Sequence, residues 1–254
     1  MTSALRLLAR FAAGLASAAA LLSAAQAQTA TYNVGATATG VPFTFLDVKT
    51  NALQGMMVDT VTAVGQAAGF KVAVQQTVFS ALIPSLTTSK IDIISAGMLK
   101  TAARAEVVDF SAPVYSYGEG LIVKADDAKA YPSLDELKGE VVGAQVGTVF
   151  LDMLNKKGIF KEVRSYDSIS DMMRDIALGR IKAALGDQPI VAYQLAQGAN
   201  TAVKLSKEYK ATNVGDVCLV VRKGDAETLA RVNKGIAAIK ADGTLAKIVA
   251  KWGL

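Results

Sequence analysis

The chain has 254 residues, with 27 Lys or Arg, 22 Asp or Glu, no His and a formal net charge of +5. The absence of His removes the commonest general base and the commonest metal ligand, and we expect no catalytic site, no metal and no cofactor. The basic residues form no dense patch, which argues against nucleic-acid binding. Cys218 is the single cysteine and excludes an internal disulfide, so stability must come from the core.

The first 27 residues have the features of a secretory signal peptide. Arg6 and Arg10 precede an uncharged run rich in Ala and Leu, and Ala25-Gln26-Ala27 supplies a small-x-small cleavage pattern. A membrane anchor is the alternative, but this run is short for a bilayer core of ~30 Å. Gln28 rather than Cys follows the cleavage pattern, which argues against a lipid anchor. We therefore expect a mature, soluble chain in the periplasm.

The first half of the mature chain alternates short strands and amphipathic helices, the pattern of an α/β fold. Period-2 alternation and buried apolar runs predict strands at 32–36, 72–78 and 91–95. Apolar residues at helical spacing predict helices at 57–68 and 82–86, with Gly69 at the C-cap of the first. These segments indicate a βαβαβ unit.

The second half begins near Tyr117 and continues the alternation. In chain order, we expect apolar strands at 121–123, 141–144, 181–185 and 218–221, a capping box at 133–136, a helix at 171–178, a helix opened by Gln188-Pro189, a helix at 229–239 broken at Asp242-Gly243, and a last helix ending at Trp252. The strands at 121–123 and 218–221 are each followed by Lys and an Asp-containing turn. We expect them to form a pair of hinge strands.

Five motifs in order resemble the polar amino-acid-binding family of periplasmic solute receptors. They are the segment 79–86 (FSALIPSL), the spacing of Asp92, Gly97-Met98, Thr101, Arg104 and Phe110-Ser111, the segment 142–148 (VGAQVGT), the segment 179–187 (GRIKAALGD), and the C-terminal set Val220, Lys223-Gly224-Asp225, Asn233, Asp242-Gly243 and Lys251-Trp252. The similarity extends over nearly the whole mature chain.

The resemblance implies a two-lobed periplasmic binding protein fold of type II with two hinge strands. Residues 28–116 plus 218–254 would form a discontinuous first lobe and residues 117–217 the second. The implied function is capture of an amino acid or related zwitterion between the lobes and delivery to an ABC transporter permease. We expect a monomer that is not an enzyme.

Family motifs assign two charged residues to the ligand. Arg104 matches the arginine that grips the α-carboxylate, for which a planar guanidinium offers two parallel hydrogen bonds. Outside this motif, Arg104 would be interpreted as a surface arginine. Asp187 matches the aspartate that accepts from the α-ammonium group. Because Asp187 precedes the helix that begins at Gln188-Pro189, it is also a candidate N-cap, and both roles remain open.

The resemblance assigns six further residues to the site. They are Phe79 against the ligand side chain, Gly97 and Leu99 through backbone groups, Thr148 and the Val149 N–H as donors to the carboxylate, and Thr37 in the side-chain wall. Leu99 stands where the family usually has Ser or Thr. Thr37 stands where cation-binding members have an acid, and Gly40 lies near the usual position of an aromatic. We therefore expect a roomier, less charged wall and a ligand without a cationic side chain.

Two other functions compete with transport. Some proteins on this scaffold are periplasmic dehydratases of prephenate- or arogenate-like acids, a reaction that needs a general acid or base. The matched pocket positions offer no acid besides Asp187. A sensor lobe is the third interpretation, but such sensors are usually fused to a membrane-spanning segment, and none follows the leader.

Overall fold

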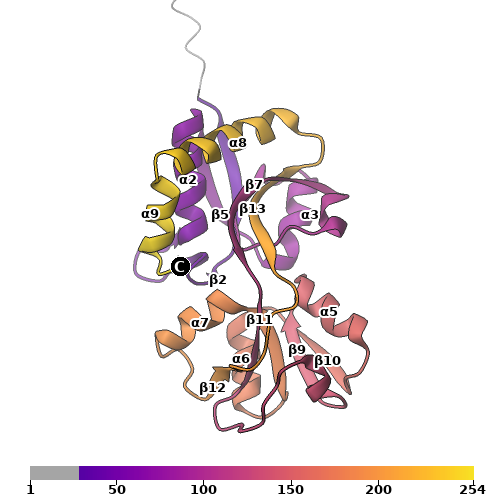
Figure 1. The fold of residues 1–254 in the computed structure, drawn as a ribbon. Coiled ribbons are helices and arrows are strands. Elements are labelled where there is room, and N and C mark those ends of the chain that lie inside the picture. Colours follow the sequence, from indigo (N-terminus) through magenta and orange to yellow (C-terminus); the bar gives the residue numbers. More distant parts are fainter. Residues whose placement is uncertain (1–28) are drawn as a thin grey trace, which may run out of the picture. The chain divides into compact units, whose positions relative to one another are not determined.

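The computed structural model describes residues 29–254, so the expected signal peptide lies outside the described residues. Residues Thr31–Leu254 form one compact unit. Its strands and helices alternate as expected for an α/β fold (Figure 1). Within residues 29–254, no helix combines the length and the apolar character needed to cross a membrane.

The first five-stranded sheet has the order β5-β1-β6-β13-β7. Its strands are β1 (Thr31–Ala36), β5 (Lys71–Gln76), β6 (Ile93–Ile94), β7 (Val108–Tyr117) and β13 (Gly215–Arg222). The first three run parallel to one another, whereas β13 is antiparallel to β6 and to β7. The predicted strand at 91–95 is thus a two-residue strand, because the chain turns away after Ile94 toward the loop that contains Gly97.

The second five-stranded sheet has the order β10-β9-β11-β8-β12. Its strands are β8 (Glu119–Lys124), β9 (Val141–Gln145), β10 (Glu162–Tyr166), β11 (Ala183–Asp187) and β12 (Val203–Leu205). The strand β9 is parallel to both of its neighbours, β10 and β11, and β8 is antiparallel to β11 and β12. A small third sheet joins β2 (Thr39–Gly40), β3 (Thr44–Asp47) and β4 (Ala52–Gln54), which the sequence analysis did not predict.

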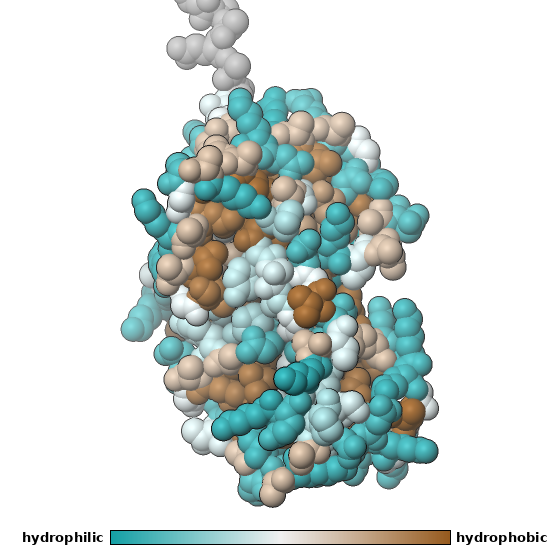
Figure 2. Space-filling view, viewed as in Figure 1, coloured by the Kyte–Doolittle hydropathy of each residue, from teal (hydrophilic) through white to brown (hydrophobic). Residues whose placement is uncertain are grey.

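Helices cover both large sheets. They are α2 (Met56–Ala68), α3 (Leu82–Thr87), α4 (Ala102–Ala105), α8 (Ala226–Ala241) and α9 (Thr244–Lys251) beside the first sheet, and α5 (Val149–Lys157), α6 (Ile169–Ala177) and α7 (Gln188–Ala196) beside the second, with 3-10 turns η1 (Phe79–Ala81) and η2 (Leu134–Leu137). We call each large sheet with its helices a lobe. On the face in Figure 2, hydrophobic residues form small patches among hydrophilic ones.

Local signals explain several helix ends. Gly69 ends α2 in the left-handed region at φ 76°, as the sequence predicted, and Gly243 separates α8 from α9 at φ 77°. The predicted capping box is wrong in detail. The Ser133 hydroxyl accepts from the backbone N–H of Asp135, while the Glu136 carboxylate lies 3.6 Å from the Lys129 amine and forms an ion pair.

The chain passes between the lobes twice, once between β7 and β8 at Gly118 and once in the segment before β13. The expectation that 121–123 and 218–221 pair with each other is wrong, since the first lies in β8 and the second in β13, on different sheets. At the crossing, β7 pairs with β13 instead, and Figure 1 shows the two strands side by side. Their pairing extends as far as Tyr117, which lies opposite Gly215.

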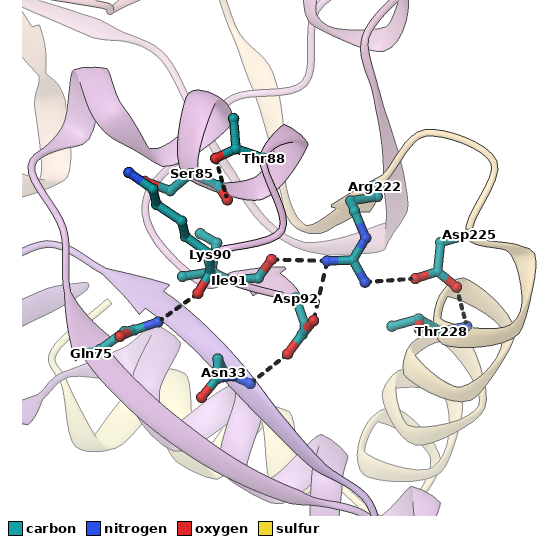
Figure 3. Close-up of polar contacts among 10 residues, drawn as sticks. All are labelled: Asn33, Gln75, Ser85, Thr88, Lys90, Ile91, Asp92, Arg222, Asp225 and Thr228. Atoms are coloured by element: carbon teal, nitrogen blue, oxygen red, sulfur yellow. Dashed lines mark hydrogen bonds and ion pairs between the residues drawn. The ribbon is translucent and has the colours of Figure 1, made fainter.

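A polar network joins three elements at the amino ends of β1 and β6 (Figure 3). The Arg222 guanidinium donates to the Asp92 carboxylate at 3.1 Å and to the Asp225 carboxylate at 3.4 Å. Asp92 also accepts from the backbone N–H of Asn33, and Asp225 caps α8 by accepting from the N–H of Thr228. All of these carboxylates have partners in the protein, so this network stabilises the first lobe.

Candidate functional site

The candidate site lies where the carboxyl ends of parallel strands from both lobes meet. In open α/β sheets this end is the usual place for a ligand, because loops and helix N-termini converge there. The cavity at this position has a volume of about 20 Å³, enough for roughly one water molecule. Its lining residues are Thr37, Thr39, Gly40, Phe43, Thr44, Phe79, Gly97, Gln145, Ile169, Asp187 and Ile190.

Arg104 is held at the border of the two lobes by a short helix. The Thr101 hydroxyl caps α4 by accepting from the Arg104 N–H at 3.2 Å. The guanidinium donates to the carbonyl oxygen of Leu99 at 2.6 Å and, across the lobes, to that of Gly147 at 2.9 Å. It also lies 5.8 Å from the centre of the Phe79 ring. Burial lowers the pKa of Arg104, but the group stays charged and has further N–H donors for an anion.

Gly147 shows why the loop after β9 needs glycine. Its φ is 78°, and a Cβ atom at this position would lie 3.0 Å from the Cα atom of Ser80 in the first lobe. The close approach of Gly147 to Ser80 and its hydrogen bond to Arg104 bring the two lobes together at this loop.

The next two residues begin α5. The Thr148 hydroxyl donates to the carbonyl oxygen of Gln145 at 2.6 Å and accepts from the N–H of Leu151 at 3.3 Å. This side chain therefore caps the helix, which differs from the expected donation to a ligand. The N–H of Val149 belongs to the first turn of α5, where backbone donors have no partner within the helix. The Arg104 guanidinium, which donates to Gly147, and the start of α5 therefore both lie next to the loop after β9.

Asp187 ends β11 and is 7% exposed. It occupies the N-cap position of α7, but its side chain makes no capping hydrogen bond. The carboxylate instead accepts from the hydroxyl of Tyr117, which also contacts the carbonyl oxygen of Gly97. Burial raises the pKa of Asp187 to about 6, although the hydrogen bond from Tyr117 and the positive charge of Arg104 both act to lower it. Among the residues that line the cavity, Asp187 is the one with an acidic side chain.

The wall around Thr37 is polar and uncharged. The hydroxyls of Thr37 and Thr44 lie 2.6 Å apart and are both buried. A Cβ atom on Gly40 would lie 3.3 Å from the Thr37 hydroxyl and 3.6 Å from Ile190, so a larger residue there would fill the cavity. Ile169 and Ile190 line the side of the second lobe.

The remaining predicted residues divide into two groups. Phe79 and Gly97 line the cavity, with Gly97 contributing its carbonyl oxygen. The side chain of Leu99 lies elsewhere, because a Cβ atom on Gly215 of β13 would be only 3.6 Å from it. Leu99 contributes the carbonyl oxygen that holds Arg104, and its side chain is not part of the cavity lining.

Sequence reasoning missed Tyr117 and six residues of the cavity lining, which are Thr39, Phe43, Thr44, Gln145, Ile169 and Ile190. Thr44 begins β3 and Phe43 lies in the turn before it, in a part of the small sheet that gave no recognised signal. Gln145 lies inside the matched segment 142–148, and its place at the end of a parallel strand was the available clue. Tyr117 was recognised only as the start of the second half. Because it ends the strand that crosses between the lobes, its hydroxyl reaches both of them.

The buried carboxylate of Asp187 is the one charged group among the residues that line the cavity. Arg104 is not among these residues, but its guanidinium has free donors and lies beside Phe79, which is one of them. Such a pair matches a ligand that has one negative and one positive group, because each buried charge then meets an opposite charge. Among the side chains of residues 29–254, no cluster of three His, Cys, Asp or Glu is placed to hold a metal ion.

Comparison with known proteins identifies the family. The family model for bacterial extracellular solute-binding proteins, family 3, matches residues 32–254. The chain belongs to this family. The ABC transporter arginine-binding protein 1 of Escherichia coli K12 is 30% identical over 224 residues, which are 87% of this chain and 89% of the relative. The L-cystine-binding protein TcyJ of the same strain is 29% identical over 219 residues, 86% of this chain and 81% of the relative.

A solved structure supports the same fold for this family 3 solute-binding protein. An ancestral arginine-binding protein bound to glutamine has a TM-score of 0.80 and 33% identity, covering 89% of this chain and 98% of that one. The prediction of a two-lobed type II periplasmic binding fold is therefore confirmed. The relatives are named as binding proteins, which favours a binding function over the dehydratase alternative.

Proposed function

We propose that the protein captures an amino acid or closely related zwitterion between its lobes and delivers it to an ABC transporter permease. The observation that carries the proposal is that the Arg104 guanidinium lies beside Phe79, a residue of the same cavity wall that contains the buried Asp187 carboxylate. Membership of a family of extracellular solute-binding proteins supports it. The names of the relatives, which include arginine and cystine binders, support an amino-acid ligand.

In this proposal Arg104 holds the α-carboxylate together with the N–H groups at the start of α5. A carboxylate bound by Arg and by backbone donors is a common form of anion site. Asp187 and the carbonyl oxygen of Gly97 receive the α-ammonium group. Phe79, Thr37 and the newly found Thr44 and Gln145 contact the rest of the ligand.

The proposed lobes are residues 28–116 plus 218–254 and residues 117–217. Sheet membership supports a division close to these bounds, although the pairing of Tyr117 with Gly215 favours moving the second boundary to about residue 214. Entry of an amino acid needs the lobes to separate, because the cavity of about 20 Å³ is much smaller than such a molecule. Separation would break the hydrogen bond from Arg104 to Gly147, which bridges the lobes.

The proposed setting is the periplasm, after removal of residues 1–27, with the protein acting as a monomer. Mass spectrometry of exported material tests this proposal, since it should begin at or near Gln28. Retention of the leader would contradict it. Sedimentation analysis of the same material should give the mass of one chain, and a stable dimer would overturn that part of the proposal.

A thermal-shift screen of the common amino acids, opines and small zwitterions tests the function. A ligand that binds only the folded protein adds about 2.7 kcal/mol at a hundredfold excess over Kd, which such a screen detects. We expect at least one α-amino acid to raise the melting temperature, and Arg104→Ala to remove the shift. Turnover of prephenate by the purified protein would instead favour the enzymatic alternative.

A further inference from the structure

The hydroxyl of Tyr117 occupies the ammonium-binding corner of the proposed site. Tyr117 is the last residue of β7 and is 6% exposed, with its ring centre 5.6 Å from that of Phe43. Its hydroxyl contacts the two groups assigned to the ligand ammonium, the carbonyl oxygen of Gly97 and Oδ1 of Asp187. The protein therefore supplies its own donor at this corner.

A proton count shows what this donor does. A tyrosine hydroxyl has one hydrogen, and the Gly97 carbonyl oxygen and the ionised Asp187 carboxylate can both only accept. The hydrogen goes to Asp187, because a hydrogen bond to a charged acceptor is the stronger one. A charged group that accepts a hydrogen bond from the protein is not left unpaired when a ligand without a matching donor enters. The second carboxylate oxygen, Oδ2, makes no hydrogen bond to another residue within 29–254, which leaves it available to an ammonium group.

We propose that Tyr117 is a specificity-determining residue that lets the site accept carboxylic acids lacking the α-ammonium group as well as α-amino acids. Without the Tyr117 hydroxyl, an acid with hydrogen at Cα would leave the Asp187 carboxylate buried with no donor, and sites of that kind reject such analogues strongly. With it, Oδ1 keeps its partner in either complex. The inference rests on the proposed function, because it concerns the same ligand.

Tyr117→Phe tests this role with little change of shape, since the ring that packs on Phe43 is kept. Tyr115→Phe is a matched control. Tyr115 lies on the same strand, its ring also packs on Phe43 at 5.4 Å, and its hydroxyl makes no hydrogen bond within the described part of the chain. The probes are two pairs of acids. The first pair is L-glutamine and 5-amino-5-oxopentanoate, and the second pair is L-leucine and 4-methylpentanoate. In each pair the second acid has the same carbon skeleton and side chain but lacks the α-amino group.

The measured quantity is the ratio of Kd for the des-amino acid to Kd for the amino acid, obtained by calorimetry. We expect a ratio below about tenfold in the wild-type protein, an increase of at least tenfold in Tyr117→Phe, and no change in Tyr115→Phe. A wild-type ratio above a hundredfold, or an unchanged or smaller ratio in Tyr117→Phe, would overturn the proposal. A smaller ratio would mean that the hydroxyl receives the ligand ammonium instead.

A measurement without ligand separates this inference from the proposed function. If neither glutamine nor leucine binds the wild-type protein, the α-amino acid found in the thermal-shift screen and its des-amino analogue take their place, and the proposed function is contradicted if no α-amino acid binds. Carbon-13 NMR of the Asp187 carboxyl group in the ligand-free protein still tests the hydrogen bond. Tyr117→Phe should raise the pKa of Asp187, with Arg104 left as the charged group that acts on it. An unchanged pKa would show that Tyr117 does not donate to Asp187.

Discussion

Arg104 of the first lobe donates a hydrogen bond of 2.9 Å to the carbonyl oxygen of Gly147 in the second. A second bond to the carbonyl oxygen of Leu99 fixes the guanidinium within its own lobe. Both acceptors are neutral, whereas a carboxylate pairs its own charge with the guanidinium and can accept two parallel hydrogen bonds from it. A ligand carboxylate therefore competes well for the remaining donors of Arg104, and its binding would join the lobes through a charged group.

Arg104→Ala should abolish ligand binding and leave the protein folded. Loss of one partner of a buried charge pair costs about 2–5 kcal/mol, or roughly 30-fold to several-thousand-fold in Kd. Calorimetry measures the affinity, and circular dichroism checks the fold. Arg231→Ala is the control, because this arginine on α8 is 41% exposed and, among residues 29–254, forms an ion pair with Glu227 alone. Unchanged affinity in Arg104→Ala would remove Arg104 from the site.

Asp187→Asn should weaken the binding of α-amino acids more than that of des-amino analogues. The amide keeps the shape of the carboxylate and can still accept from Tyr117, but it has no charge to pair with the ligand ammonium. Calorimetric titration of both ligand types into the variant measures the difference. Equal losses for the two types would show that Asp187 has only a structural role at the start of α7.

Affinity for α-amino acids should rise with pH through about 6 and level off above it. Burial raises the pKa of Asp187 to about 6, and a bound ammonium would stabilise the ionised carboxylate. Below that pH the site must lose a proton before it binds, so the affinity should fall by up to tenfold per pH unit. Calorimetry between pH 4.5 and 8 measures this. A flat profile in that range would contradict the assignment of Asp187.

The stability of the ligand-free protein should depend on pH in the opposite direction from the affinity, so the Asp187 contribution should fall as the pH rises. The pKa of Asp187 is about 6 in the folded protein and near 3.8 in the unfolded chain, so the folded state binds more protons between these values. The contribution of Asp187 to the free energy of unfolding is therefore largest below pH 3.8 and is lost as the pH rises to 6. Urea unfolding of the wild-type protein and of Asp187→Asn at pH 4, 5 and 7 measures this contribution of Asp187 to the free energy of unfolding.

Glu119→Ala should destabilise the crossing between the lobes. Its buried carboxylate accepts from the Tyr209 hydroxyl, from the N–H and hydroxyl of Thr212 and from the N–H of Asn213, which lie in the segment before β13. Burial alone would raise the pKa of Glu119, but the hydrogen bonds from Thr212 and Tyr209 outweigh it and hold the pKa below its ordinary value.

We expect the Glu119→Ala variant to lose about 2–4 kcal/mol, because each buried donor left unsatisfied costs roughly 1–3 kcal/mol. Urea unfolding measures the loss. Glu136→Ala should stay within about 0.5 kcal/mol, since Glu136 is 43% exposed and its ion pair is on the surface. A loss in Glu119→Ala no larger than in Glu136→Ala would show that this carboxylate does not hold the crossing together.

The sequence predicted the helices with clear periodicity and caps, such as α2 with Gly69 and α7 with Gln188-Pro189. It missed the small sheet, whose strands of two to four residues are too short for a periodic signal. It also misplaced the hinge pairing, because the apolar pattern of a short strand does not show which sheet the strand joins.

The same limit applies to the site. Arg104 and Asp187 were assigned to the site through motifs, whereas the contact of Tyr117 with Asp187 joins residues 70 positions apart and has no local signature. The position of the Leu99 side chain against Gly215 depends on how β13 passes the loop after β6, which is also a tertiary relationship.

The central claim is that the site binds an amino acid with an uncharged side chain, and competition calorimetry tests it most directly. Asp187 is the one acid among the residues that line the cavity, and it is assigned to the α-ammonium group, so a cationic side chain would be buried without a partner at a cost of several kcal/mol. We predict that L-glutamine or another uncharged amino acid binds the wild-type protein and that excess L-arginine or L-lysine does not displace it. Submicromolar binding of arginine or lysine, with uncharged amino acids unable to compete, would contradict the account.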